Sequence, residues 1–227
     1  MAKEALVGLA QRCATVELDD DEVQLKPGLW LRGPARLPVT TTPRGPATDP
    51  ILLELVDEQG RTIGVAEKLS AHQAPGQLHR AFSVFLFDTE GRMLLQQRAL
   101  SKYHSPGVWS NTCCGHPYPD ERAEAAAARR VAEELGLDDF SLEPAGTVTY
   151  EHPDDISGLV EKEYNHLFVG VVKQRPEPDP AEVHDFRYVS SEELAELQRE
   201  NRFSAWFPTV LQAALSGVRR IAPDGGW

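Results

Sequence analysis

The segment from residue 111 to residue 117 carries side chains that could do chemistry. Cys114 offers a thiol and His116 an imidazole, and an expected helix follows within a few residues. That helix has two adjacent arginines and, one turn later, two adjacent glutamates. Imidazole, thiolate and carboxylate groups bind divalent metals, and arginine binds anions through paired hydrogen bonds. The pattern predicts a metal site and an anion site in one loop–helix unit.

The spacing of these residues resembles the Nudix box, G-x5-E-x7-R-E-U-x-E-E-x-G-U. The matching residues are Gly115, Glu121, Arg129, Glu133, Glu134 and Gly136. Arg130 stands where hydrolytic Nudix enzymes usually carry a glutamate. The Cys-Gly-His-Pro sequence at 114–117 and the arginine pair are instead similar to the type 1 isopentenyl-diphosphate isomerases. This resemblance extends over roughly residues 50 to 215, through the order and spacing of several motifs.

The resemblance implies one transition-metal ion per chain, held by three histidines and two glutamates. They are His72, His79, His116, Glu161 and Glu163. The two glutamates are two residues apart on an expected strand, so both point to the same face. Three nitrogen and two carboxylate donors suit Zn²⁺ or Mn²⁺, or else Fe or Co, better than Mg²⁺. Taken without the resemblance, these residues are also compatible with hydrogen-bonded surface histidines and a solvated strand face.

The resemblance also implies a diphosphate site beside this metal. Glu134 corresponds to the residue that helps to hold a Mg²⁺ ion with the substrate, and Mg²⁺ prefers oxygen ligands. The family's diphosphate-binding positions match Lys68, Arg98, Lys102 and Arg130. A diphosphate needs several convergent cations, and arginine adds bidentate geometry. Taken in isolation, a glutamate pair on a helix and four basic residues would be ordinary surface charges.

The family's reaction moves a double bond by one carbon through a tertiary carbocation, which needs proton transfer on two faces of the substrate. By resemblance, Cys114 serves one face, and Glu163 with Tyr150 serves the other. Trp206 matches the family's tryptophan, whose π face can stabilise the cation; ordinary core packing is its alternative. Just after Tyr150 the chain departs from the family pattern, because the segment 151–155 carries one extra residue.

The remaining histidines and cysteines are assigned no role. They are His104, His152, His166, His184, Cys13 and Cys113. Three cysteines, two of them adjacent, do not make a disulfide framework and fit a reducing compartment. The first residues lack a secretory or mitochondrial targeting pattern, and no apolar run approaches the ~20 residues that span a bilayer. We expect a cytoplasmic protein.

Composition and charge limit the partners that this chain can have. Its 227 residues carry 35 acidic and 23 basic side chains, for a formal net charge of −12. This excess argues against binding to nucleic acid or to a membrane surface, although local cations and metal ions can still attract an anionic substrate. The resemblance implies a small-molecule substrate, isopentenyl diphosphate, and we expect a monomer or weak homodimer.

Three regions are expected along the chain. Residues 1–48 are acidic and proline-rich and should form a flexible extension, although residues 39–42 could add a strand to a sheet edge. Residues 49–217 should form the domain, with residues 218–227 as a tail. Strands are expected at 51–56, 62–66, 79–87, 93–97, 146–150, 164–172 and 186–189, and helices at 123–135, 190–200 and 207–215. Strands and helices interleave without regular βαβ repeats, which favours an α/β fold of the α+β type with helices flanking a Nudix-like mixed sheet.

These features favour an isomerase of isoprenoid biosynthesis that interconverts isopentenyl diphosphate and dimethylallyl diphosphate. Arg130 favours an isomerase over a hydrolase, because a hydrolase clusters carboxylates around the cations that activate water. An arginine there removes one carboxylate and adds a ligand for the intact diphosphate. Two alternatives remain open at this point: a Nudix diphosphohydrolase, and a catalytically silent Nudix-like binding module. Intact Cys114 and Glu163 argue against the silent module.

Overall fold

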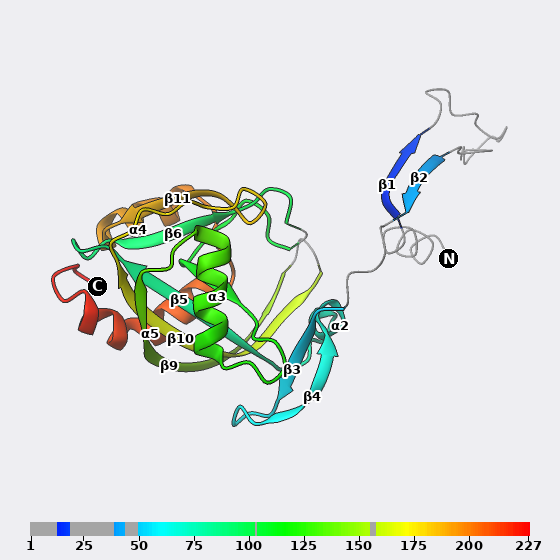
Figure 1. The fold of residues 1–227 in the computed structure, drawn as a ribbon, viewed down its shortest axis with the longest axis horizontal. Coiled ribbons are helices and arrows are strands. Elements are labelled where there is room, and N and C mark those ends of the chain that lie inside the picture. Colours follow the sequence, from blue (N-terminus) through cyan, green and yellow to red (C-terminus); the bar gives the residue numbers. More distant parts are fainter. Residues whose placement is uncertain (1–12, 19–38, 44–49, 103, 155–157) are drawn as a thin grey trace. The chain divides into compact units, whose positions relative to one another are not determined.

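In the computed structural model the chain divides into two compact units, Met1–Pro50 and Ile51–Trp227. The structure describes residues 13–18, 39–43, 50–102, 104–154 and 158–227 (Figure 1). In the first unit, β1 (Cys13–Leu18) pairs antiparallel with β2 (Val39–Pro43). The sequence left open whether residues 39–42 belong to a flexible extension or add a strand to a sheet edge. They form a strand, and that strand pairs with β1. The rest of the expected extension, and the side chain of Cys13, lie outside the described part of the chain.

The described part of the second unit is built around one mixed β-sheet. Its strands are β3 (Leu52–Val56), β4 (Thr62–Glu67), β5 (His79–Phe87), β6 (Met93–Arg98), β7 (Trp109–Ser110), β8 (Cys113–Gly115), β9 (Phe140–Pro153), β10 (Val160–Val172) and β11 (Val183–Val189). The central order is β11-β6-β5-β10-β9. β5 and β10 run parallel, and the other pairs are antiparallel. β3 pairs with β4 and β5, β7 with β6, and β8 with β5. The expected mixed sheet is confirmed.

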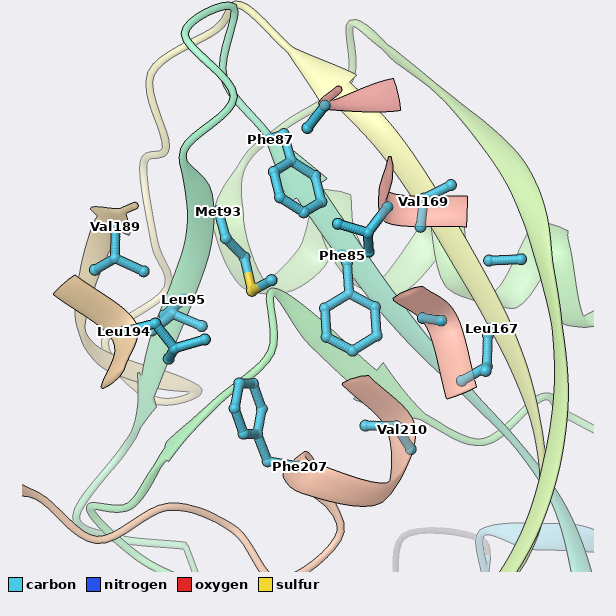
Figure 2. Close-up of a cluster of buried hydrophobic side chains, with 14 of the residues drawn as sticks. Phe85, Phe87, Met93, Leu95, Leu167, Val169, Val189, Leu194, Phe207 and Val210 are labelled. Atoms are coloured by element: carbon cyan, nitrogen blue, oxygen red, sulfur yellow. The ribbon is translucent and has the colours of Figure 1, made fainter. Parts of the chain in front are cut away.

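Helices cover both faces of this sheet (Figure 1). They are α2 (Lys68–His72), α3 (Ala123–Leu135), α4 (Ser191–Glu200) and α5 (Phe207–Ile221). β5 is almost wholly buried, and its side chains alternate between two cores. Phe82 and Val84 join the core beneath α3, whereas Phe85 and Phe87 join the core beneath α4 and α5. Figure 2 shows this second core.

α3 is held against its face of the sheet by its small and branched side chains. Ala126, Ala127 and Val131 are fully buried, so the helix approaches the sheet closely. Gly136 ends the helix at φ 65°, and a Cβ there would lie 2.8 Å from the carbonyl oxygen of Glu177. Only glycine fits this turn without strain. α3 thus presents its arginine and glutamate pairs at a defined position.

Several elements extend beyond their expected bounds. β9 continues past residue 150 to Pro153, and β10 begins at Val160 instead of residue 164. The two strands are longer than expected because they form one long antiparallel ladder. α2 was not expected; Glu67 caps it by accepting hydrogen bonds from the amides of Leu69 and Ser70. α5 runs through the expected boundary at residue 217 to Ile221. Beyond it, the Trp227 ring packs against Phe87 at 5.5 Å.

No helix in the described residues is long and apolar enough to cross a membrane.

Candidate active site

Strand register places Glu163 at the centre of the site. Glu163 of β10 lies beside His79 of the parallel strand β5 and opposite Tyr150 of the antiparallel strand β9. Glu161 and Glu163 are both buried, and Lys162 between them is partly exposed. The period of two along a strand therefore points both carboxylates to the same interior face, as expected.

The five expected metal ligands converge on one point. One ligand atom from each of them lies within 4.8 Å of all the others, and these residues are His72, His79, His116, Glu161 and Glu163. His72 Nε2 lies 3.1 Å from Glu161 Oε2, and His116 Nε2 lies 3.2 Å from Glu163 Oε1. His79 Nε2 and His116 Nε2 face each other at 3.1 Å. Three imidazole nitrogens and two carboxylates turned toward a common point form a donor set for a cation.

The ring orientations of two histidines fit metal binding. The Nδ1 atoms of His72 and His79 lie 2.7 and 2.8 Å from the carbonyl oxygens of Lys68 and Gln77. A carbonyl only accepts, so each Nδ1 carries a hydrogen, and in the neutral ring Nε2 keeps a lone pair for the cluster. Against the effect of burial, the hydrogen bond with Glu161 raises the pKa of His72, so a metal ion binding there would displace a proton. Burial lowers the pKa of His79 to about 4, and burial holds the pKa of His116 well below its usual range. Neutral imidazoles are the form that binds a metal.

The two glutamates differ in their electrostatic surroundings. Burial opposes the charge on Glu161, but hydrogen bonds with His104 and His72 hold its pKa well below the usual range. Burial, and then the charge of Glu161, raise the pKa of Glu163. A divalent cation at the cluster would favour the ionised form of both carboxylates. The donor set therefore fits the expected transition metal.

The expected diphosphate-binding residues meet on one wall of the adjoining pocket, whose volume is about 440 Å³. These residues are Lys68, Arg98, Lys102 and Arg130. Burial, opposed by Glu161 and reinforced by the other three cations, lowers the pKa of Lys68. Such a concentration of positive charge is costly in a protein of net charge −12, unless an anion balances it.

Part of this positive charge is balanced by carboxylates of the chain itself. Arg130 donates to Glu133 at 2.7 Å, to Glu134 at 2.5 Å and to Glu182 at 3.1 Å. Glu134 is buried, and its other oxygen accepts from Gln96 at 3.0 Å. A carboxylate beside the cationic wall is well placed to share a Mg²⁺ ion with a bound diphosphate.

The two adjacent cysteines point to opposite sides of the sheet. On β8, Cys114 lies opposite Ser83 and lines the pocket, whereas Cys113 is fully buried in the core beneath α3. Burial raises the pKa of the Cys114 thiol to about 12, so at neutral pH it carries its proton. Of these two thiols, only Cys114 can reach a pocket ligand.

Tyr150 and Trp206 complete the pocket wall. The Tyr150 hydroxyl donates to Glu163 Oε2, which leaves Oε1 facing the histidines. Register and hydrogen bond together place Tyr150 as expected, in spite of the extra residue that follows it. Trp206 is buried and lines the pocket, and the Arg98 guanidinium lies 5.7 Å from its ring centroid. Of the thirteen expected site residues, twelve line the pocket, and the remaining one, His79, is fully buried.

Comparisons with known proteins agree with this geometry. A NUDIX domain model matches residues 77–208, more than half of the chain. An isopentenyl-diphosphate Delta-isomerase of Streptomyces griseus subsp. griseus is 66% identical over 178 residues, which cover 78% of this chain and 90% of that protein. Its counterpart in Streptomyces coelicolor is 63% identical over 193 residues, covering 84% and 98%. This chain belongs to the isopentenyl-diphosphate Delta-isomerase family.

This chain also shares its fold with a more distant protein of solved structure. DR0079 from Deinococcus radiodurans superposes with a TM-score of 0.60 at 18% identity, covering 72% of this chain and 98% of that one. At that identity the likeness concerns the fold alone.

Three side chains of the site were not expected from the sequence. Asn165 is fully buried and donates to Glu163 Oε2 at 2.8 Å and to the Tyr150 hydroxyl at 3.2 Å. It lies two residues beyond Glu163, so the same strand period could have found it. Glu182, which binds Lys102 and Arg130, lies in the turn immediately before β11, where no local pattern marks it as a site residue. His104, assigned no role, contacts Glu161 and lines the pocket.

The Nudix-box residues Glu121 and Arg129 have a structural role in this isomerase-family chain. The Arg129 guanidinium donates two hydrogen bonds to the Glu121 carboxylate, at 2.9 and 2.8 Å, and lies 4.2 Å from the Tyr118 ring centroid. This pair ties the segment after His116 to α3. It thereby holds the thiol and imidazole in place beside the helix.

Proposed function

We propose that this chain interconverts isopentenyl diphosphate and dimethylallyl diphosphate, in isoprenoid biosynthesis. The observation that carries the proposal is one pocket that holds a thiol, a buried carboxylate and a wall of four cations. The cations would bind the diphosphate, and the thiol and the carboxylate would reach the hydrocarbon part. Membership of the isomerase family supports the same reaction.

The chemistry follows from the two proton-carrying groups, Cys114 and Glu163. One of them protonates the double bond, and the π electrons form the new C–H bond and leave a tertiary carbocation. The other removes a proton from the neighbouring carbon, and the electrons of that C–H bond form the new double bond. Because the reaction is reversible, each group is an acid in one direction and a base in the other. Such groups contribute ~10²–10⁴-fold each when they are well placed.

Neighbouring side chains would support these steps. Tyr150 and Asn165 both donate to Glu163 Oε2 and so fix the direction in which this carboxylate points. The ring of Trp206 offers a negatively polarised face to the cation, and its burial excludes water that would otherwise capture the cation. Arg98, Lys102 and Arg130 would anchor the diphosphate at a fixed distance from these groups.

We assign Mn²⁺ or Zn²⁺ to the cluster of three histidines and two glutamates, at one ion per chain, and Mg²⁺ to Glu134 with the substrate diphosphate. Mixed nitrogen and oxygen donors suit the first pair of ions, and oxygen donors suit Mg²⁺. The bound transition metal would supply positive charge that favours the ionised form of Glu163. We place the protein in the cytoplasm, as a monomer or weak homodimer that binds neither nucleic acid nor membrane.

The test uses purified full-length protein, isopentenyl diphosphate, Mg²⁺ and either Mn²⁺ or Zn²⁺. Proton NMR should show the methyl signals of dimethylallyl diphosphate, and incubation in D₂O should place deuterium on the carbons that exchange protons. A parallel assay for phosphate and monophosphate should stay at background. Phosphate release faster than double-bond movement would instead favour a Nudix diphosphohydrolase.

A further inference from the structure

His104 occupies a position that the proposed reaction does not explain. It is 5% exposed, lines the pocket, and stands between two acidic side chains. Its Nδ1 lies 2.8 Å from Glu161 Oε1, and its Nε2 lies 3.0 Å from Asp154 Oδ2. A carboxylate oxygen only accepts hydrogen bonds, so the ring nitrogen donates to Glu161. His104 itself is not among the five residues that converge on the metal position.

Glu161 divides its two oxygens between His104 and the metal cluster. Oε1 accepts from His104, while Oε2 faces His72 Nε2 at 3.1 Å. A carboxylate bound at one oxygen cannot rotate freely about its last bond, so His104 determines where Oε2 points. A metal ligand that is oriented before the ion arrives loses less conformational freedom on binding.

The chain around His104 is itself fixed in place. The Arg98 guanidinium donates to the carbonyl oxygens of His104 at 3.0 Å and of Ser105 at 3.1 Å. Ser105 adopts φ 45°, a left-handed conformation that is uncommon for a serine. The His104 ring also lies near Trp206, with 5.9 Å between the two ring centroids. Asp154 and Trp206 thus lie beside the imidazole ring itself, and Arg98 holds the backbone that carries it.

We infer that His104 is a positioning residue, which orients Glu161 toward the transition metal and thereby determines how tightly the ion is held. The inference rests on the proposed metal centre. Outer hydrogen-bond partners of metal ligands typically contribute ~10–100-fold to metal affinity. A packing role alone would make the size and shape of His104 matter, but not its hydrogen-bond donor.

Matched substitutions separate the two roles. His104→Leu removes the donor at similar size. His104→Asn keeps a donor close to the position of Nδ1, and His104→Gln moves the donor outward to the position of Nε2. His184→Leu, at an exposed residue of β11, is the control. Each protein is stripped of metal, and its dissociation constant for Co²⁺ is measured by competition with a chelator, together with the absorption spectrum of bound Co²⁺.

We expect His104→Leu and His104→Gln to weaken Co²⁺ binding by about 10-fold or more and to change the spectrum. His104→Asn should stay within about threefold of the unsubstituted protein, and His184→Leu should equal it. Unchanged affinity in His104→Leu, or equal loss in the Asn and Gln variants, would overturn the inference. If His104→Leu does not fold, the Asn and Gln pair decides by itself.

Measuring Co²⁺ binding in His116→Ala beside His104→Leu distinguishes failure of this inference from failure of the proposed metal centre. Unsubstituted protein that binds no Co²⁺ would overturn the metal centre and, with it, the role of His104. Protein that binds Co²⁺ and loses it in His116→Ala, but not in His104→Leu, would leave the metal centre standing and overturn only the inference.

Discussion

Glu163 and Tyr150 are directly opposite each other on neighbouring antiparallel strands, and the Tyr150 hydroxyl donates to one oxygen of the Glu163 carboxylate. The other oxygen faces the histidine cluster. One side chain is thereby divided between a proton-transfer network and a metal site. This division predicts that the network can be disturbed while the metal stays bound.

Tyr150→Phe should lower kcat by about 10-fold to 100-fold, with little change in KM and full metal content. The reason is that Glu163 Oε2 loses its hydroxyl donor, whereas Oε1 keeps its histidine neighbours. Tyr164→Phe is the matched control, because Tyr164 is next to Glu163 on β10 but is half-buried and outside the pocket. Steady-state kinetics and elemental analysis measure the effect, and an unchanged kcat would contradict the role given to Tyr150.

The adjacent residues Cys113 and Cys114 allow the same substitution to be compared inside and outside the pocket. Cys114→Ala should reduce isomerisation by at least about a thousandfold, because Cys114 lines the pocket. Cys113→Ala should keep nearly full activity and lose about 1 kcal/mol of stability, because Cys113 is buried in the core beneath α3. Product formation and urea unfolding are the measurements. Similar loss of activity in both variants, or activity retained in Cys114→Ala, would refute the assignment.

Purified protein should carry about one transition-metal ion per chain. His116→Ala should lower metal content and activity together, because it removes one of five converging ligands. His166→Ala is the control, since His166 lies 3.1 Å from the Arg80 guanidinium and outside the cluster. Elemental analysis that finds full metal in His116→Ala would show that the ion, if any, is bound elsewhere.

Arg130→Gln should raise KM by about tenfold or more, because it removes a cation from the diphosphate wall. Arg130→Glu should raise it further and also destabilise the fold, because it places a fourth carboxylate beside Glu133, Glu134 and Glu182. Neither variant should become a hydrolase, since water placement depends on other residues. Arg122→Gln, at a largely exposed arginine, is the control. A KM that is unchanged in Arg130→Gln would exclude this residue from substrate binding.

Deletion of residues 1–45 should leave kcat and KM within about threefold of the full chain. The described site residues all belong to the unit Ile51–Trp227, which has its own cores. The measurements are activity, solubility and thermal unfolding of the shortened protein. Collapse of activity or solubility would mean that the first unit contributes to the site or to the sheet.

Local sequence determined the elements whose signals are contained within a few neighbouring residues. The helix 123–135 could be predicted because its alanines and Gly136 act within the helix itself, and the Nudix box could be recognised because its spacing is that of one helix. The strand period also indicated that Glu161 and Glu163 share a face. These inferences need no knowledge of what lies across the sheet.

Only the tertiary structure decided which distant residues meet. The parallel pairing of β5 with β10 brings Glu163 beside His79, and the ladder of β9 with β10 brings it opposite Tyr150. Register between strands depends on the packing of both sheet faces, which no single segment contains. For the same reason no local pattern indicated His104 beside Glu161, or Glu182 beside Arg130. His104 and Glu182 lie outside the helices and strands, and their partners lie on β10 and α3, far away in the chain, so only the folded domain brings them within reach.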